Sequence, residues 1–247
     1  MADRGWNPKA CFIGVGKNGA IISQKLKTEW GKLMAFYYDY KEQNPKEFYE
    51  LSVSPIFDIF SLESILDDTK VIDTAKYHFV FMVNSDENEL SASNTKTVFK
   101  NEPFVSITIA TGNMLNKKCF KNETLAILTD REFHNTACDF MIDLMRFEMF
   151  PRFVSFDLSD FKAIHRRTVN ILYFNSSRVD YEKEFYEFYK TYVDTGNIKK
   201  NAMVIFYYQD CEDVMRYFLK QDNLNISLFS DHCASPTSDK LKALIIS

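Results

Sequence analysis

A glycine-rich turn between a buried strand and a helix most restricts the fold of this chain. Lys9–Val15, KACFIGV, has the apolar composition of a strand buried on both faces, and it runs into GVGKNG at residues 14–19. Only seven of the 247 residues are glycine, and Gly14, Gly16 and Gly19 lie within this one turn. Apolar residues then recur at helical spacing over residues 20–30. This strand–turn–helix order is typical of an α/β domain with a mostly parallel sheet.

The turn has the chemistry of an anion site. Glycines let backbone N–H groups approach a phosphate closely, and the helix dipole favours negative charge at the helix N-terminus. We therefore predict that Gly14, Gly16, Lys17 and Gly19 hold the phosphates of a nucleotide. A tight strand-to-helix turn that binds no ligand is the alternative interpretation, and it stays open.

The same GxGxxG pattern is the fingerprint of Rossmann dinucleotide enzymes. That interpretation requires an acidic residue about 20 positions further on, at the end of the second strand, to bind the ribose. Asp39 lies 20 residues after Gly19, and it follows apolar residues 33–38, which we predict as that second strand. The chain shows no recognisable catalytic set downstream, so this enzyme remains a secondary alternative.

The rest of the chain predicts an α/β half followed by a smaller α+β half. We assign residues 1–130 to a nucleotide-binding-type domain, residues 131–150 to a central connecting helix, and residues 151–247 to a C-terminal α+β domain. Strands are predicted at residues 77–83, 104–110, 124–128, 169–174, 202–208, 227–229 and 242–246; helices at 89–100, 181–193 and 210–220; loop or irregular helix at 41–55; and a helical turn at 62–66.

Composition excludes several classes of function. The net charge of −4 and the pI near 5.7 give no whole-chain attraction to nucleic acid. No stretch approaches the roughly 20 apolar residues of a membrane span, so we expect no membrane insertion. The five cysteines form no CxxC pair and no secretory signal precedes them, which favours a cytoplasmic protein with free thiols. The histidines lack metal-ligand spacing, so no metal site is predicted.

An acidic loop follows the predicted central helix. Residues 148–174, EMFPRFVSFDLSDFKAIHRRTVNILYF, have the pattern of a helix end, a proline break, a loop, a short helix and a strand. Asp157 and Asp160 lie three residues apart where the loop becomes helix. Capping of that helix is one explanation, because acidic side chains at a helix start accept backbone N–H bonds and complement the dipole.

Taken together, this order of elements resembles the FtsZ/tubulin superfamily, and residues 13–26 and 148–164 resemble it at residue level. The resemblance implies a tubulin/FtsZ-like fold: an N-terminal Rossmann-like parallel sheet, a central helix and a smaller C-terminal α+β domain. It also implies binding of GTP or GDP, with Asn135 in the central helix reading the guanine base. Asp157 and Asp160 match the synergy-loop acids that complete the GTPase site of the next subunit in a filament.

One departure from the family pattern bears on catalysis. Members carry a run resembling GGGTGTG after the strand that matches residues 77–83, whereas residues 84–89 here read NSDENE, with Asp86, Glu87 and Glu89 and no glycine. Two like charges about 4 Å apart repel by about 4 kcal/mol at an effective dielectric constant near 20. That energy is worth about a thousandfold in phosphate affinity.

We therefore predict a pseudo-GTPase, a divergent cytoskeletal or cell-division-associated protein without efficient GTP hydrolysis. It is expected to assemble with itself or to bind an FtsZ-like filament protein in a bacterial or archaeal cytoplasm. An active GTP-dependent filament former is the first alternative, in which Lys17 and Mg²⁺ offset the acidic residues of the loop. The Rossmann dinucleotide enzyme is the second.

Overall fold

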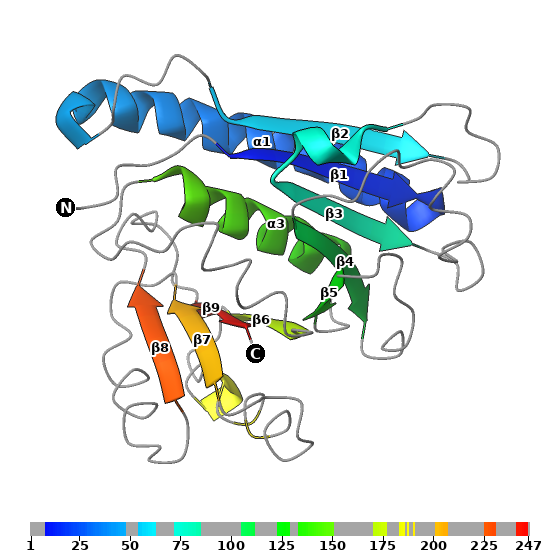
Figure 1. The fold of residues 1–247 in the computed structure, drawn as a ribbon, viewed down its shortest axis with the longest axis vertical. Coiled ribbons are helices and arrows are strands. Elements are labelled where there is room, and N and C mark those ends of the chain that lie inside the picture. Colours follow the sequence, from blue (N-terminus) through cyan, green and yellow to red (C-terminus); the bar gives the residue numbers. More distant parts are fainter. Residues whose placement is uncertain are drawn as a thin grey trace. The chain divides into compact units, whose positions relative to one another are not determined.

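The chain forms two compact units, residues 1–168 and residues 169–247, and each is described by itself. The computed structural model of the protein is drawn in Figure 1. It describes residues 8–47, 54–62, 72–84, 105–111, 123–128, 133–150, 170–176, 183–185, 187, 190, 201–206, 225–230 and 241–246.

The first unit is a parallel sheet with helices. Its described strands follow the order β2-β1-β3-β4-β5, and every neighbouring pair is parallel. The predicted α/β class and the N-terminal Rossmann-like parallel sheet are therefore confirmed. The described elements are β1 (Lys9–Val15), α1 (Gly16–Gln43), the short 3-10 helix η1 (Pro45–Glu47), β2 (Ile56–Leu62), a second 3-10 helix η2 (Thr74–Lys76), β3 (Phe79–Asn84), β4 (Val105–Thr111), β5 (Glu123–Leu128) and α3 (Phe133–Met149).

Both long helices pack on one face of this sheet. Trp30 of α1 meets Phe57 of β2 edge to face with ring centroids 5.3 Å apart, and Phe140 of α3 meets Phe81 of β3 at 6.1 Å. The rings of Phe57 and Phe81 are themselves 5.8 Å apart across β1, so they share one face. Each fully buried aromatic side chain stabilises the fold by about 2 kcal/mol or more.

The opposite face has its own apolar cluster. Side chains alternate along a strand, so the residues between those facing the helices point to the other side. Ile72 and Tyr77, on either side of η2, pack there. The remaining buried members are Cys11, Ile13, Val15, Leu62, Val80 and Met82, with Phe60 packed against them.

Helix α1 is much longer than the sequence suggested. Residues 33–38, predicted as a strand ending at Asp39, lie inside α1, so that prediction was wrong. The buried positions Leu33 and Tyr37 are four residues apart, with exposed residues between them, which is the period of a helix rather than the alternation of a strand. Apolar composition alone did not distinguish the two.

Strand β2 was not predicted from the sequence. Ile56–Leu62 pairs with β1 along its whole length, from Lys9 opposite Ile56 to Val15 opposite Leu62. The predicted loop over residues 41–55 contains the end of α1, η1 and the residues just before β2. The helical turn predicted at residues 62–66 begins on the last residue of this strand, and its other residues lie outside the described part of the chain.

The remaining predicted elements of the first unit match well. Strands β3, β4 and β5 agree with residues 77–83, 104–110 and 124–128 to within two residues, and α3 agrees with the predicted helix at 131–150. The helix predicted at residues 89–100 lies outside the described residues. No described helix of the chain is long and apolar enough to cross a membrane.

The second unit contains a mixed sheet. Its described strands follow the order β6-β9-β7-β8, with β9 antiparallel to β6 and to β7, and β7 parallel to β8. Residues 183–185, 187 and 190 are helical, as predicted. The helix predicted at residues 210–220 lies outside the described residues. The strands are β6 (Asn170–Ser176), β7 (Asn201–Phe206), β8 (Asn225–Ser230) and β9 (Leu241–Ile246), at the predicted positions.

Candidate functional site

From the strand order of the first unit, a ligand-binding crevice is expected at the carboxyl ends of β1 and β3. From β1 the chain continues through α1 to β2 on one side, and β3 then lies on the other side of β1. The direction of strand order thus reverses between β1 and β3. In open parallel sheets, ligands bind outside the carboxyl ends of the strands at such a point.

The glycine turn lies at this crevice. It joins the last residue of β1 to α1, which begins at Gly16 with a φ of 67°. Gly14 and Gly19 press against each other: a Cβ on Gly14 would lie 2.5 Å from the carbonyl oxygen of Gly19. Close packing of strand on helix and a left-handed backbone therefore account for these three glycines.

The start of α1 lacks a capping side chain. Val15, the N-cap residue, gives no side-chain hydrogen bond to the first turn, and that turn contains no acidic residue. Lys17 within it is exposed. Uncapped N–H groups at a helix start attract anions, typically by about 0.3–1 kcal/mol at an exposed surface. These features suit an anion, and phosphate binding by the turn stays a prediction.

A second helix begins at the same place. His134, in the first turn of α3, lies with Nε2 2.8 Å from Oδ1 of Asn18 in the first turn of α1. At the other end, the ring of Phe150 packs against those of Phe36 and Tyr37 of α1 at centroid distances of 5.5 and 5.7 Å. The two helices therefore run parallel with their N-termini together. Neither first turn has an acidic residue, so two positive dipole ends converge.

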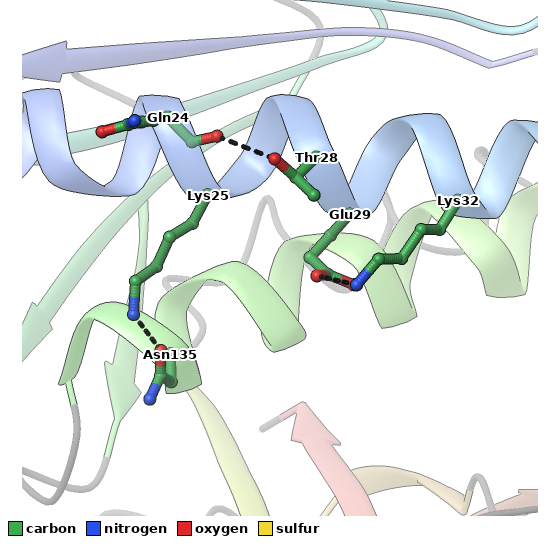
Figure 2. Close-up of polar contacts among 6 residues, drawn as sticks. All are labelled: Gln24, Lys25, Thr28, Glu29, Lys32 and Asn135. Carbon is green, nitrogen blue, oxygen red and sulfur yellow. Dashed lines mark hydrogen bonds and ion pairs between the residues drawn. The ribbon is translucent and has the colours of Figure 1, made fainter.

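Asn135 is tied to α1 beside this point. The ammonium of Lys25 donates a hydrogen bond to Oδ1 of Asn135, and Figure 2 shows the side chain of Lys25 reaching from α1 to the first turn of α3. On α1 itself, Lys32 pairs with Glu29 at 2.7 Å, away from Asn135. The predicted base-reading residue thus lies near the predicted phosphate residues, through a contact between helices.

The other predicted residues are placed only in part. Asn84, the last residue of β3, is in register with Val15, so the loop that follows begins next to the glycine turn. The acidic residues of that loop at 86, 87 and 89 lie outside the described residues. So do Asp157 and Asp160, and their predicted role stays a prediction.

Asp39, the acidic residue that a Rossmann dinucleotide enzyme would need beside the ribose, lies far from the glycine turn. Asp39 lies on α1, 20 residues beyond Gly19, which is about 30 Å along a helix at 1.5 Å per residue. Its carboxylate accepts a hydrogen bond from Nε2 of Gln43 at 2.9 Å. A ribose next to phosphates bound at the turn lies far out of its reach. The predicted Rossmann role of Asp39 is therefore wrong.

Three residues near the crevice were not predicted: Asn18, Lys25 and His134. Lys25 and Asn135 are 110 residues apart in the chain, and their contact follows from the parallel packing of α1 and α3. The sequence does not reveal that packing. The helical period around Lys25 and the short distance from Asn18 to the glycines are the signals that could have pointed to the two α1 residues.

A cluster of groups with shifted pKa values surrounds Asp58 of β2. Burial, and then the charge of Asp58, raise the pKa of Cys11, which is paired in register with Asp58. Burial and the hydrogen bond that its hydroxyl donates to Asp58 raise the pKa of Tyr77. Lys76 completes this group with an ion pair to Asp58 at 3.6 Å. The arrangement is that of a structural polar cluster holding η2 to β2.

Comparisons with known proteins give a likeness to solved structures. No protein-family model and no curated protein matches the sequence. Among solved structures, the chain is similar to a single-residue mutant of FtsZ from M. jannaschii, with 10% sequence identity and a TM-score of 0.44 over 97% of this chain and 90% of that chain.

Proposed function

We propose that this chain binds the phosphates of a guanine nucleotide, GTP or GDP, at the crevice between β1 and β3. The meeting of two helix N-termini at the glycine turn, neither with an acidic residue in its first turn, is the observation that carries the proposal. Each helix end contributes about half a positive charge. Lys17 adds a full one in the same turn.

We also propose that the protein is a divergent member of the FtsZ/tubulin superfamily and that it hydrolyses GTP poorly. The order of elements supports the family: a glycine turn after the first strand, a parallel sheet, a long helix α3 and then a second unit. Poor hydrolysis is supported by the sequence after β3, where Asp86, Glu87 and Glu89 stand in place of glycines. Carboxylates there would repel the β- and γ-phosphates.

With hydrolysis lost, the protein would act through contacts with other proteins. We propose self-assembly, or binding to an FtsZ-like filament protein, in a bacterial or archaeal cytoplasm. The acids at 157 and 160 would then remain as helix caps or subunit contacts. The motivation is a retained phosphate-binding turn next to an altered signature loop.

Calorimetric titration of GDP and GTP into the purified chain tests the binding step. We expect Kd values that weaken about tenfold in Lys17→Met, equivalent to about 1.4 kcal/mol. Lys27→Met is the matched control, because Lys27 is another exposed lysine of α1, almost three turns further along. Absence of binding by the wild-type chain would remove the proposal.

Turnover and assembly are measured separately. We expect phosphate release from GTP to stay far below a rate of about 1 per minute, a slow value against typical enzyme turnover. Sedimentation with and without GTP distinguishes the alternatives. Sedimentation that requires GTP, together with phosphate release faster than that rate, would favour an active GTPase. In such an enzyme Lys17 and Mg²⁺ would offset the negative charge of the acidic residues in the loop.

A further inference from the structure

The hydrogen bond between Lys25 and Asn135 connects the two helices that frame the crevice. Both side chains are exposed, and they come from the third turn of α1 and the first turn of α3. Figure 2 shows the ammonium meeting the oxygen of the amide, with the amide nitrogen on the side away from Lys25.

The chemistry of lysine fixes this orientation. An ammonium group has three donors and no acceptor, so it can meet the amide only at its oxygen. The opposite rotamer of Asn135 would set two N–H groups against a positive charge. Rotation of the amide by 180° is therefore disfavoured as long as Lys25 holds the oxygen. The amide nitrogen, a donor, remains directed away from α1.

We infer that Lys25 is a positioning residue that sets the base preference of the site by fixing the amide of Asn135 as a donor. The inference rests on the proposed nucleotide function. A fixed N–H donor pairs with a keto oxygen, such as O6 of guanine or hypoxanthine. It meets the amino group of adenine as a like donor and leaves both groups unpaired, which is the stronger source of discrimination.

A purely structural role explains this contact less well. Hydrogen bonds and ion pairs between exposed side chains contribute little to stability. Packing of Phe150 on α1 and of Trp30 and Phe140 on the sheet already holds the helices. Loss of Lys25 should therefore leave the fold intact and release the amide, which changes selectivity rather than stability.

The test compares Lys25→Met, Lys25→Arg and Lys27→Met with the wild-type chain. Dissociation constants are measured by calorimetry for GDP, inosine diphosphate, ADP and inorganic pyrophosphate. Methionine keeps the length of the side chain without a donor, and arginine keeps a donor. Lys27 is an exposed lysine two positions further along the same helix, so Lys27→Met controls for loss of charge.

We expect the wild-type chain to bind GDP and inosine diphosphate more tightly than ADP. Lys25→Met should reduce this ratio about fivefold, the worth of one hydrogen bond, with pyrophosphate affinity unchanged. Lys25→Arg and Lys27→Met should keep the wild-type ratio. This inference is overturned, and the proposed function is not, if Lys25→Met leaves the ratio of the ADP and GDP dissociation constants unchanged. The same holds if Lys25→Met weakens pyrophosphate binding as much as it weakens GDP binding.

Failure of the wild-type chain to bind any of the four ligands would overturn both this inference and the proposed function. Melting curves of all variants accompany the titrations, and Lys25→Leu, which also lacks a donor, replaces Lys25→Met if the latter does not fold. A shift of the base ratio in Lys27→Met equal to that in Lys25→Met would also count against the inference, since it would point to general electrostatics.

Discussion

Gly14 and Gly19 are packed backbone to backbone, so that neither position has room for a side chain. A Cβ on Gly19 would lie 2.3 Å from the carbonyl carbon of Gly14, and a Cβ on Gly14 would lie 2.5 Å from the carbonyl oxygen of Gly19. The obstructing atoms are main-chain atoms of β1 and α1, which cannot rotate away. The close approach of the first strand to the first helix therefore depends on both residues.

We predict that Gly14→Ala destabilises the chain by about 3 kcal/mol, because the helix must shift away from the strand. Gly16→Ala should cost less, about 1–2 kcal/mol, the strain of a side chain at its left-handed φ of 67°. Urea denaturation followed by circular dichroism measures both. Equal stability of Gly14→Ala and the wild type would show that strand and helix are not in this contact.

Gly31 gives the opposite expectation. It lies within α1, and a Cβ there would meet no atom within 4 Å. Glycine in a helix interior is less favourable than alanine by about 0.5–1 kcal/mol, mainly through the freedom of the unfolded chain. Gly31→Ala should therefore raise Tm by about 2 °C for a chain of this size.

Ala35 provides the matched control for this change. It is exposed on the same helix, four residues further on. Ala35→Gly should lower Tm by a similar amount through the same backbone effect. Scanning calorimetry of both variants tests the pair, and a destabilising Gly31→Ala would mean that something closely approaches α1 at this position.

The glycine turn also shows which parts of the fold could be predicted from the sequence. GxGxxG after an apolar run predicted β1, the turn and the start of α1, because close strand–helix packing and a phosphate site demand the same residues. The pattern could not distinguish these two causes. That is why ligand binding is better tested through Lys17, whose side chain is exposed, than through the glycines.

The secondary-structure predictions were wrong where the apolar composition of a segment and the spacing of its buried residues indicate different elements. Residues 33–38 are apolar and aromatic enough for a strand, but only every third or fourth of them is buried, and the helix continues to Gln43. Ile56–Leu62 is equally apolar, and its β-branched and aromatic residues after Pro55 were the signal for a strand. The contacts of Lys25 and His134 depend on how two distant helices pack, which local sequence does not encode.

Two buried cysteines should be chemically inert in the folded chain. Burial, with the nearby charges of Asp139 and Glu29, raises the pKa of Cys138 to about 12, and burial raises that of Cys11 as well. At pH 8 only about one in ten thousand Cys138 thiols is then a thiolate, the reactive form.

Iodoacetamide at pH 8, followed by peptide mass spectrometry, measures this protection. We expect neither cysteine to be alkylated in the native chain on the timescale in which both react in 8 M urea, a fully denaturing concentration at ordinary urea sensitivity (about 1–3 kcal/mol per M). Native alkylation of Cys138 at the rate seen in urea would contradict its burial.

His78 couples stability to pH. It lies just before β3, where Nδ1 accepts a hydrogen bond from the backbone N–H of Lys9 at 2.9 Å, which requires that nitrogen to be unprotonated. Burial, and then the charge of Lys9, lower the pKa of His78 below its ordinary value of 6.5. Below pH 6.5 the unfolded chain therefore takes up a proton that the folded chain resists.

The contribution of His78 to stability is accordingly complete above pH 6.5 and is lost as the pH falls through the lowered pKa of the folded state. We expect the free energy of unfolding to fall more between pH 7.5 and pH 5.5, about one unit on either side of that ordinary value, in the wild type than in His78→Asn. Asparagine keeps an acceptor for the Lys9 N–H but cannot titrate. Parallel pH profiles for the two proteins, from denaturant titrations at each pH, would show that His78 is protonated as easily in the folded chain as in the unfolded one.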